Sequence, residues 1–84
     1  MKIKYTKHAA NDIEYWRTKD KKNYKRIKQL IDNIIETPYE GLGKPEALRY
    51  NLTGKWSRRI TREHRLVYEV TNNEIIIYQC RFHY

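Results

Sequence analysis

The chain has 84 residues, 39% of them hydrophobic and 33% charged, which suits one small domain, residues 1–84, with a single core. Its longest apolar run, residues 75–78, is far shorter than the ~20 residues that a membrane helix needs, so we expect no membrane span. Lys and Arg total 18 against 10 Asp and Glu, which gives a formal net charge of +8. Such an excess attracts polyanions: nucleic acid, an acidic membrane face or an acidic protein partner.

Cysteine usage and the N-terminal residues point to a reducing compartment. Cys80 is the only cysteine, so no intrachain disulfide can form. Residues 1–5 are not followed by the apolar core of a signal peptide. One cysteine and three histidines do not suit a structural zinc site. We therefore expect a cytoplasmic protein with no metal and no other cofactor.

The first half of the chain predicts one strand and two helices. Residues 2–5 alternate between apolar and polar side chains, which is typical of a short strand. Thr6 is placed to cap a helix over residues 7–18. Asp20 is a second cap, and the helix that it starts, residues 21–37, has a wide apolar stripe. The stripe consists of Tyr24, Ile27, Leu30, Ile31, Ile34 and Ile35.

The second half alternates with a period of two and predicts about four strands in a meander. The alternating segments are residues 48–52, 55–60, 65–70 and 74–82. Turn residues, rich in Asn, Thr and Gly, separate several of them. We expect an α+β fold, with two helices on one face of an antiparallel sheet of four to five strands. The second face of the sheet is then free for another use.

Several charged residues of the strands fall on the face away from the helices. Arg59 and Arg65 lie on neighbouring strands, Glu46 precedes the meander, and His83 stands at the end of the chain. In a meander these positions can lie side by side. A carboxylate, two guanidinium groups and an imidazole suit cleavage of RNA through its 2′-hydroxyl. A base removes the hydroxyl proton, a cation stabilises the phosphorane, and an acid protonates the departing 5′-oxygen.

Each of these residues also has a structural interpretation. Glu46 can begin a helix or a turn after Pro45, and the arginines can be solvated or ion-paired strand residues. Glu63 can pair with a nearby arginine, and a histidine next to the terminus can be inert. His8 and His64 receive no role at this point.

Five blocks carry a family resemblance: residues 43–48 (GKPEAL), 51–54 (NLTG), 56–60 (WSRRI), 63–68 (EHRLVY) and 80–84 (CRFHY). In this order they resemble the YoeB (Txe) family, which belongs to the RelE-like toxins of bacterial toxin–antitoxin pairs. The likeness spans nearly the whole chain.

The resemblance implies a RelE-like fold and a toxin that cleaves messenger RNA in the A site of a translating ribosome. The cleavage would be a metal-free attack of the 2′-hydroxyl that leaves 2′,3′-cyclic phosphate and 5′-hydroxyl ends. The implied partners are a YefM-type antitoxin, the ribosome with its messenger RNA, and operator DNA through the antitoxin complex only. Family members are often dimeric, which implies a homodimer.

The resemblance also implies roles for matched residues. Glu46 would be the general base, Arg65 the phosphate-binding residue, His83 the general acid and Tyr84 a residue that places the substrate. The supporting residues would be Arg59 and Glu63, for phosphate and for orienting neighbours, and Lys44 and Arg49, for the RNA backbone.

Two positions differ from the commonest family sequence: Ala47, where proline is frequent, and Tyr50, where histidine is frequent. Neither changes a predicted acid, base or phosphate-binding residue. The main alternative function is a non-catalytic basic protein that binds RNA or the ribosome and blocks translation. A relative that poisons DNA gyrase would lack the combined Glu, Arg and His set, and a helix-turn-helix DNA reader does not fit the strand-like second half.

Overall fold

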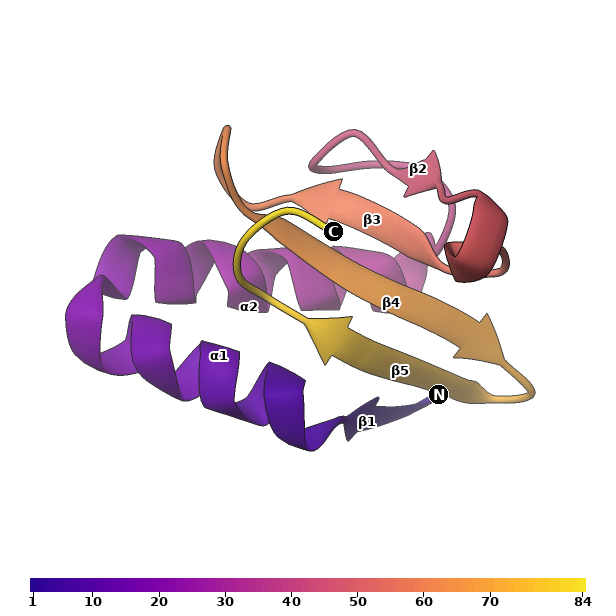
Figure 1. The fold of residues 1–84 in the computed structure, drawn as a ribbon. Coiled ribbons are helices and arrows are strands. Elements are labelled where there is room, and N and C mark those ends of the chain that lie inside the picture. Colours follow the sequence, from indigo (N-terminus) through magenta and orange to yellow (C-terminus); the bar gives the residue numbers. More distant parts are fainter.

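The computed structural model describes all residues, 1–84, and contains one five-stranded sheet with two helices on one face (Figure 1). The strand order is β1-β5-β4-β3-β2. The elements are β1 Lys2–Tyr5, α1 Lys7–Lys19, α2 Lys21–Glu36, β2 Glu46–Ala47, a 3₁₀ turn Tyr50–Leu52, β3 Trp56–Arg59, β4 Arg65–Thr71 and β5 Glu74–Gln79. The expected α+β fold is confirmed.

Both helices begin at the capping residues that the sequence indicates. The Thr6 hydroxyl accepts a hydrogen bond from the Ala9 amide at 3.0 Å. The Asp20 carboxylate accepts from the amides of Lys22 and Asn23 at 3.0 and 3.2 Å. Each cap supplies partners for amides at the start of a helix, which have none within the helix itself. Neither helix combines the length and apolar character that crossing a bilayer requires.

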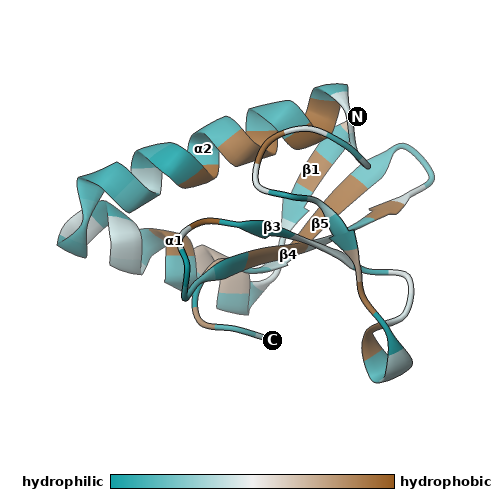
Figure 2. Ribbon diagram, turned by 90° about the horizontal axis from the view of Figure 1, so that it is seen from above, coloured by the Kyte–Doolittle hydropathy of each residue, from teal (hydrophilic) through white to brown (hydrophobic).

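The core lies between α2 and the middle of the sheet. Figure 2 shows hydrophobic residues at intervals along the ribbon of α2, and Ile27, Leu30 and Ile34 of this helix are fully buried. Burial of one such side chain stabilises a fold by about 1.5–3 kcal/mol. Their partners are Leu66, Tyr68, Ile75 and Ile77 of the sheet, Ile60 just after β3 and Cys80 just after β5.

The sheet is mixed. β2, β3, β4 and β5 pair antiparallel, as the meander predicts, whereas β1 pairs parallel with β5. The N-terminal strand thus covers one edge of β5 and lies beside the strand that leads to the C-terminus.

The predicted strand at residues 48–52 is wrong. Only Glu46–Ala47 pairs with β3, and Tyr50–Leu52 forms a 3₁₀ turn instead. Tyr50 has a φ of 59°, a left-handed conformation that ends any extended strand. The apolar alternation here reflects a turn that packs Leu48 inward, not a strand.

The last strand is shorter than predicted, because β5 ends at Gln79 and not at residue 82. Two side chains of α1 form hydrogen bonds with the backbone of the next residue, Cys80. Asp12 Oδ2 accepts from the Cys80 amide at 3.0 Å, and Trp16 Nε1 donates to the Cys80 carbonyl at 2.7 Å. Residues 80–84, which we call the C-terminal tail, then turn back across the sheet face opposite the helices (Figure 1).

Candidate active site

The open face of the sheet carries a row of residues that the strand register aligns. Glu46 lies opposite Ser57 in β3, Ser57 opposite Val67 in β4, and Val67 opposite Gln79 in β5. Arg59 and Arg65 are also directly opposite each other. Because side chains alternate between the two faces of a sheet, positions an even number apart on one strand share a face. The register therefore places Glu46, Arg59 and Arg65 on one surface.

The C-terminal tail follows β5 and reaches the same surface across the open face of the sheet (Figure 1). The Tyr84 hydroxyl donates to Glu46 Oε1 at 3.3 Å. His83 is exposed, and its ring lies 4.7 Å from the ring of Tyr84, measured between centroids. The structure thus brings Glu46 together with Tyr84, and places the His83 ring beside that of Tyr84. Glu46 and Tyr84 are 38 positions apart along the chain.

Arg65 is oriented by the loop that joins β3 to β4, residues 60–64. Its Nη1 donates to the carbonyls of Thr61, Arg62 and His64 at 2.9, 3.1 and 3.1 Å. The residue is only 8% exposed, yet it makes no ion pair. A guanidinium group has five N–H donors. The loop holds one of its nitrogens, and Nε and Nη2 make no hydrogen bond within the protein.

Arg59 and Glu63 are exposed and do not pair with each other or with another charge. The Arg59 amide donates to the Gly43 carbonyl at 2.7 Å, which ties the segment before Glu46 to the end of β3. The Glu63 amide donates to the Thr61 hydroxyl at 3.2 Å. The interpretation of Glu63 as the ion-pair partner of an arginine is therefore wrong.

Glu69, also on the open face, is used elsewhere. The Tyr78 hydroxyl donates to Glu69 Oε1 at 2.7 Å. This hydrogen bond, with burial, raises the pKa of Tyr78 above its ordinary value. The ammonium of Lys55 lies 4.7 Å from the centre of the Tyr78 ring. These three residues form a separate cluster toward the other end of the strands.

A hollow of about 410 Å³ lies beside Glu46, between the β2 segment, the 3₁₀ turn and Tyr84. Arg49 lines it, and Lys44 is exposed just before Glu46. Glu46 and Tyr84 therefore line a hollow together with one basic residue, Arg49.

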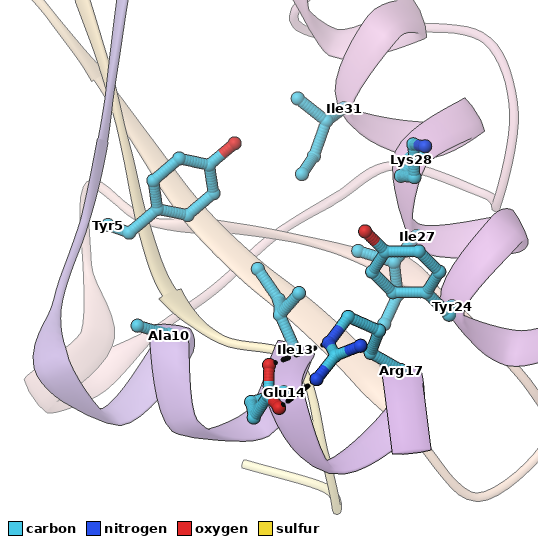
Figure 3. Close-up of a pocket in the computed structure, with 9 residues that line it drawn as sticks. All are labelled: Tyr5, Ala10, Ile13, Glu14, Arg17, Tyr24, Ile27, Lys28 and Ile31. Carbon is cyan, nitrogen blue, oxygen red and sulfur yellow. Dashed lines mark hydrogen bonds and ion pairs between the residues drawn. The ribbon is translucent and has the colours of Figure 1, made fainter. Parts of the chain in front are cut away.

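A second groove, of about 420 Å³, lies between α1 and α2 on the helical side of the molecule (Figure 3). Its walls are mostly apolar, with Ile13, Tyr24 and Ile31 among them. Its acidic and basic groups include Glu14 and Arg17, which form an exposed ion pair with each other. This groove lacks the free carboxylate and imidazole of the Glu46 surface.

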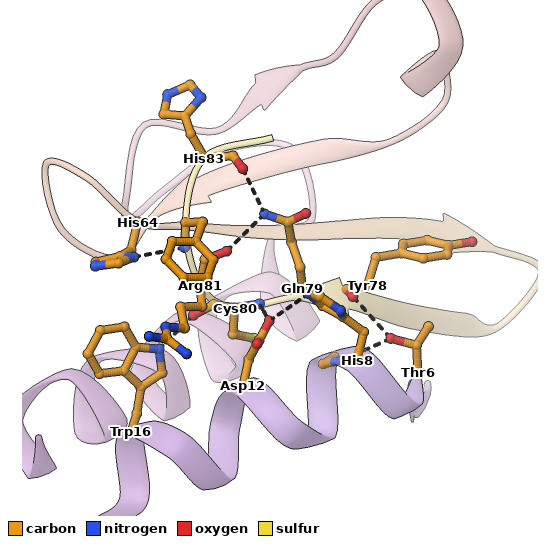
Figure 4. A network of polar contacts seen from close by, with 12 residues as sticks. Thr6, His8, Asp12, Trp16, His64, Tyr78, Gln79, Cys80, Arg81 and His83 are labelled. Carbon is orange, nitrogen blue, oxygen red and sulfur yellow. Dashed lines mark hydrogen bonds and ion pairs between the residues drawn. The ribbon is translucent and has the colours of Figure 1, made fainter. Parts of the chain in front are cut away.

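Several residues that hold the site were not singled out from the sequence. Asp12 and Trp16 of α1 fix the start of the C-terminal tail, and His64 contacts it further on (Figure 4). Arg58 is completely buried beneath the open face. Its position on the same side as Trp56 and Ile60 was the one signal in the sequence that could have revealed this.

No group of three or more His, Cys, Asp or Glu side chains lies close enough together to hold a metal ion. Burial raises the pKa of the Cys80 thiol, and the charge of Asp12 adds to this shift.

A family model for the YoeB-like toxins of bacterial type II toxin–antitoxin systems matches residues 5–84. The chain belongs to the YoeB toxin family. It is 50% identical to the toxin YoeB of Escherichia coli K12 over 84 residues, which is 100% of both chains. It is 49% identical to the toxin YoeB of Synechocystis, over 100% of this chain and 98% of that one.

Solved structures agree with this assignment. The YoeB/ParE toxin from Agrobacterium tumefaciens superposes with a TM-score of 0.98 at 45% identity, over 100% of both chains. A YoeB dimer from Staphylococcus aureus gives 0.93 at 46% identity, over 100% of this chain and 98% of that one. YafQ from E. coli, at 19% identity and a TM-score of 0.77, over 95% and 90% of the two chains, shares the fold. The expected membership of the YoeB family and its RelE-like fold are confirmed.

Proposed function

We propose that this toxin is a ribosome-dependent endoribonuclease that cleaves messenger RNA in the ribosomal A site and thereby inhibits translation. The observation that carries the proposal is the contact between the Tyr84 hydroxyl and Glu46, with His83 alongside. It puts an exposed carboxylate and an exposed imidazole on one basic surface. These are the two kinds of group that general acid–base catalysis uses most often.

Glu46 is the proposed general base. Tyr84 occupies one of its two carboxylate oxygens, and Oε2 makes no hydrogen bond within the protein. In the reaction Glu46 takes the proton of the 2′-hydroxyl, and the 2′-oxygen forms a bond to the adjacent phosphorus. The substrate itself supplies the nucleophile.

Arg65 and Arg59 are the proposed partners of the phosphate. Arg65 is held in place by three loop carbonyls, so its remaining N–H donors are already oriented before RNA arrives. Donors that need no reorientation stabilise the charge of a phosphorane better than mobile ones. Arg59, Lys44 and Arg49 are exposed and would contact the backbone phosphates.

His83 is the proposed general acid. It gives a proton to the 5′-oxygen as the bond from that oxygen to phosphorus breaks. The products are a 2′,3′-cyclic phosphate on one fragment and a 5′-hydroxyl on the other. Tyr84 would help to place the RNA beside Glu46, and Glu63 would support the loop that orients Arg65.

The ribosome would align the reacting atoms. The catalytic surface is open, with Glu46, His83 and Tyr84 all exposed, so the protein alone does not enclose an RNA strand. Correct orientation of the reacting groups can lower an activation barrier by roughly 7–11 kcal/mol. The outer side of α2, with Lys21, Lys22 and Lys25, offers a surface for ribosomal RNA, and such docking weakens as salt is added.

A YefM-type antitoxin is the proposed inhibitor. The solved complexes of YoeB with YefM from S. aureus, similar to this chain at 45–46% identity, support this partner. The YoeB dimer from the same organism supports a homodimer. Contact with operator DNA would come through the antitoxin complex, and the site of action would be the cytoplasm, where ribosomes translate.

Cleavage mapping in a purified translation system tests the proposal. Wild-type protein is expected to cut messenger RNA on ribosomes and to leave 2′,3′-cyclic phosphate and 5′-hydroxyl ends. Glu46→Gln and His83→Ala are expected to fold normally and to lose about 10²–10⁴-fold in cleavage rate. Glu40→Gln, an exposed carboxylate in the loop before Glu46, is the matched control and should keep the wild-type rate. A 5′-phosphate product would exclude the proposed nucleophile.

The alternative is a basic protein that binds the ribosome and blocks it without cutting. The charge of +8 and the exposed lysines of α2 favour it equally. The same experiment separates the two functions. If Glu46→Gln still arrested translation as strongly as the wild type, and no RNA were cut by either protein, the binding function would replace the nuclease.

A further inference from the structure

The C-terminal tail carries two of the proposed site residues on a short segment outside the sheet. β5 ends at Gln79, and Cys80 is fixed from both sides by Asp12 and Trp16. This anchor lies three residues before His83, so it does not by itself decide where the last two side chains go. A second anchor is needed between them.

That second anchor is at Phe82. Its amide donates to Nδ1 of His64 at 2.8 Å, and its carbonyl accepts from the Arg65 amide at 2.9 Å. Both backbone polar groups of Phe82 are therefore bonded to two successive residues, the last of the β3–β4 loop and the first of β4. Figure 4 shows the tail passing between α1, which carries Asp12 and Trp16, and His64 of the β3–β4 loop.

Phe82 needs such support because its backbone is strained. Its φ is 65°, in the left-handed region that costs a residue with a side chain roughly 1–2 kcal/mol. This conformation turns the tail back over the sheet toward Glu46. Without the bond to His64, the Arg65 amide and the Gln79 side chain, which donates to the Arg81 carbonyl at 3.1 Å, remain as polar contacts of the tail, and nothing else bonds the Phe82 amide. Relief of the strain then favours a more extended conformation at Phe82, which would direct His83 and Tyr84 elsewhere.

The side chains around Phe82 add to this support. The ring of His64 packs edge-on against Trp16 at 4.8 Å and lies 5.9 Å from the ring of Phe82. The guanidinium group of Arg81 lies between two rings, 3.5 Å from Tyr15 and 4.4 Å from Phe82. The Nε of Arg81 is buried and has no hydrogen-bond partner, so the contacts of the guanidinium group with the two rings replace its hydration.

The hydrogen bond requires a particular form of His64. An amide can donate only to a ring nitrogen that carries a free lone pair, so Nδ1 holds no proton and the ring proton sits on Nε2. The role of His64 depends on one acceptor atom at one place, and not on charge.

We propose that His64 is a positioning residue of the nuclease: its Nδ1 holds the Phe82 peptide in the left-handed turn that carries His83 and Tyr84 to Glu46. The catalytic part of this inference rests on the proposed function. Misplacement of a reacting group by about 1 Å can cost roughly 10²-fold in rate.

Three substitutions separate positioning from packing. In His64→Asn the amide oxygen lies where Nδ1 lies and can accept from Phe82. In His64→Gln the same amide reaches the place of Nε2 instead, and in His64→Leu only the apolar contact with Trp16 remains. We expect His64→Gln and His64→Leu to cleave messenger RNA on ribosomes about 10–100-fold more slowly at saturation, with KM for the ribosome unchanged. His64→Asn should restore most of the rate.

Amide hydrogen exchange gives a readout that does not depend on activity. The Phe82 amide should be protected in the wild type and in His64→Asn, and should exchange much faster in His64→Gln and His64→Leu, while core amides of β4 keep their protection. Equal protection of Phe82 in all four proteins would overturn the inference whether or not RNA is cut. Unprotected Phe82 together with a wild-type cleavage rate would overturn its catalytic part alone. A wild-type protein that never cuts RNA would instead refute the proposed function, and the exchange data would still decide whether His64 holds the tail.

Discussion

Arg58 offers the sharpest test of how the fold supports the site. It is fully buried and makes no ion pair, yet all five N–H bonds of its guanidinium group have an acceptor. The acceptors are the Tyr68 hydroxyl (3.1 Å), Asn33 Oδ1 (2.6 Å) and the carbonyls of Leu42 (2.8 Å), Thr37 (2.7 Å) and Glu40 (3.1 Å). Three of these belong to the loop between α2 and β2, which leads to Glu46. Arg58 thus organises that loop from beneath the sheet.

Replacement by methionine keeps the bulk and removes every donor. Asn33 Oδ1 and the Glu40 carbonyl retain another donor, from the Leu42 amide and the Thr37 hydroxyl. The Thr37 carbonyl retains the Glu40 amide, and the Tyr68 hydroxyl still donates to the Pro38 carbonyl. The Leu42 carbonyl alone is left with no partner. A buried acceptor left without a partner costs about 1–3 kcal/mol. The other four acceptors each lose a hydrogen bond from a charged donor, and such a bond contributes about 1.5–3 kcal/mol. Part of this is offset because the variant no longer buries a charge, which itself costs several kcal/mol.

We therefore expect Arg58→Met to lower the free energy of unfolding by about 3 kcal/mol, a large share of the roughly 4–13 kcal/mol typical of a chain this long. At roughly 4–8 °C per kcal/mol for a domain of this size, Tm should fall by roughly 12–24 °C.

Urea unfolding followed by circular dichroism measures the loss. Arg59→Met is the matched control, because it removes the same side chain from the next position of β3, where it is exposed, and should change stability by less than about 0.5 kcal/mol. Equal unfolding midpoints for the two variants would show that relief of the buried charge outweighs the lost hydrogen bonds, and would refute this reasoning.

Two further predictions concern backbone strain and alkaline pH. Gly43→Ala should destabilise the protein by about 2–3 kcal/mol, because φ is +81° and a Cβ atom would lie 2.9 Å from Leu30. Gly54→Ala is the control: its φ is +96°, but no atom lies closer than 3.7 Å to the added Cβ, so it should cost about 1 kcal/mol. Similar urea unfolding midpoints for the two variants would contradict this prediction. Burial raises the pKa of both the Cys80 thiol and the Tyr68 hydroxyl. The folded protein therefore holds these protons more tightly, so stability is full below the ordinary values of 9.0 and 10.0 and should decline as pH rises beyond them, and Cys80→Ala should delay the decline.

The sequence predicted the N-terminal half of the fold well because its signals are local. Thr6 and Asp20 act within three residues of themselves, and the apolar stripe of α2 needs no knowledge of its partner. The segment 48–52 was misassigned because its alternation of apolar residues is equally compatible with a 3₁₀ turn. The decisive feature, the left-handed backbone of Tyr50, is not visible in a pattern of polarity.

The site was predicted only in part for a related reason. Alternation places Arg59 and Arg65 on one face, and the register confirms that they face each other. The residues that hold the tail gave no local signal, because Asp12 and His64 act on partners 68 and 18 positions away. Arg58 is different: it stood on the apolar side of its strand, and a buried arginine there could have been inferred.

Both halves of the proposed catalytic pair lie on segments that the sheet barely holds. Glu46 sits in a strand of two residues at the edge of the sheet, and its loop depends on Arg58. His83 and Tyr84 lie on a tail that is held by side chains of α1, by His64 and by a single backbone hydrogen bond from Arg65 of β4. Alignment of the site can therefore change while the core stays folded. An antitoxin segment that displaced the tail from Phe82 onward would separate acid from base, and so would inhibit cleavage even where it left Glu46 uncovered.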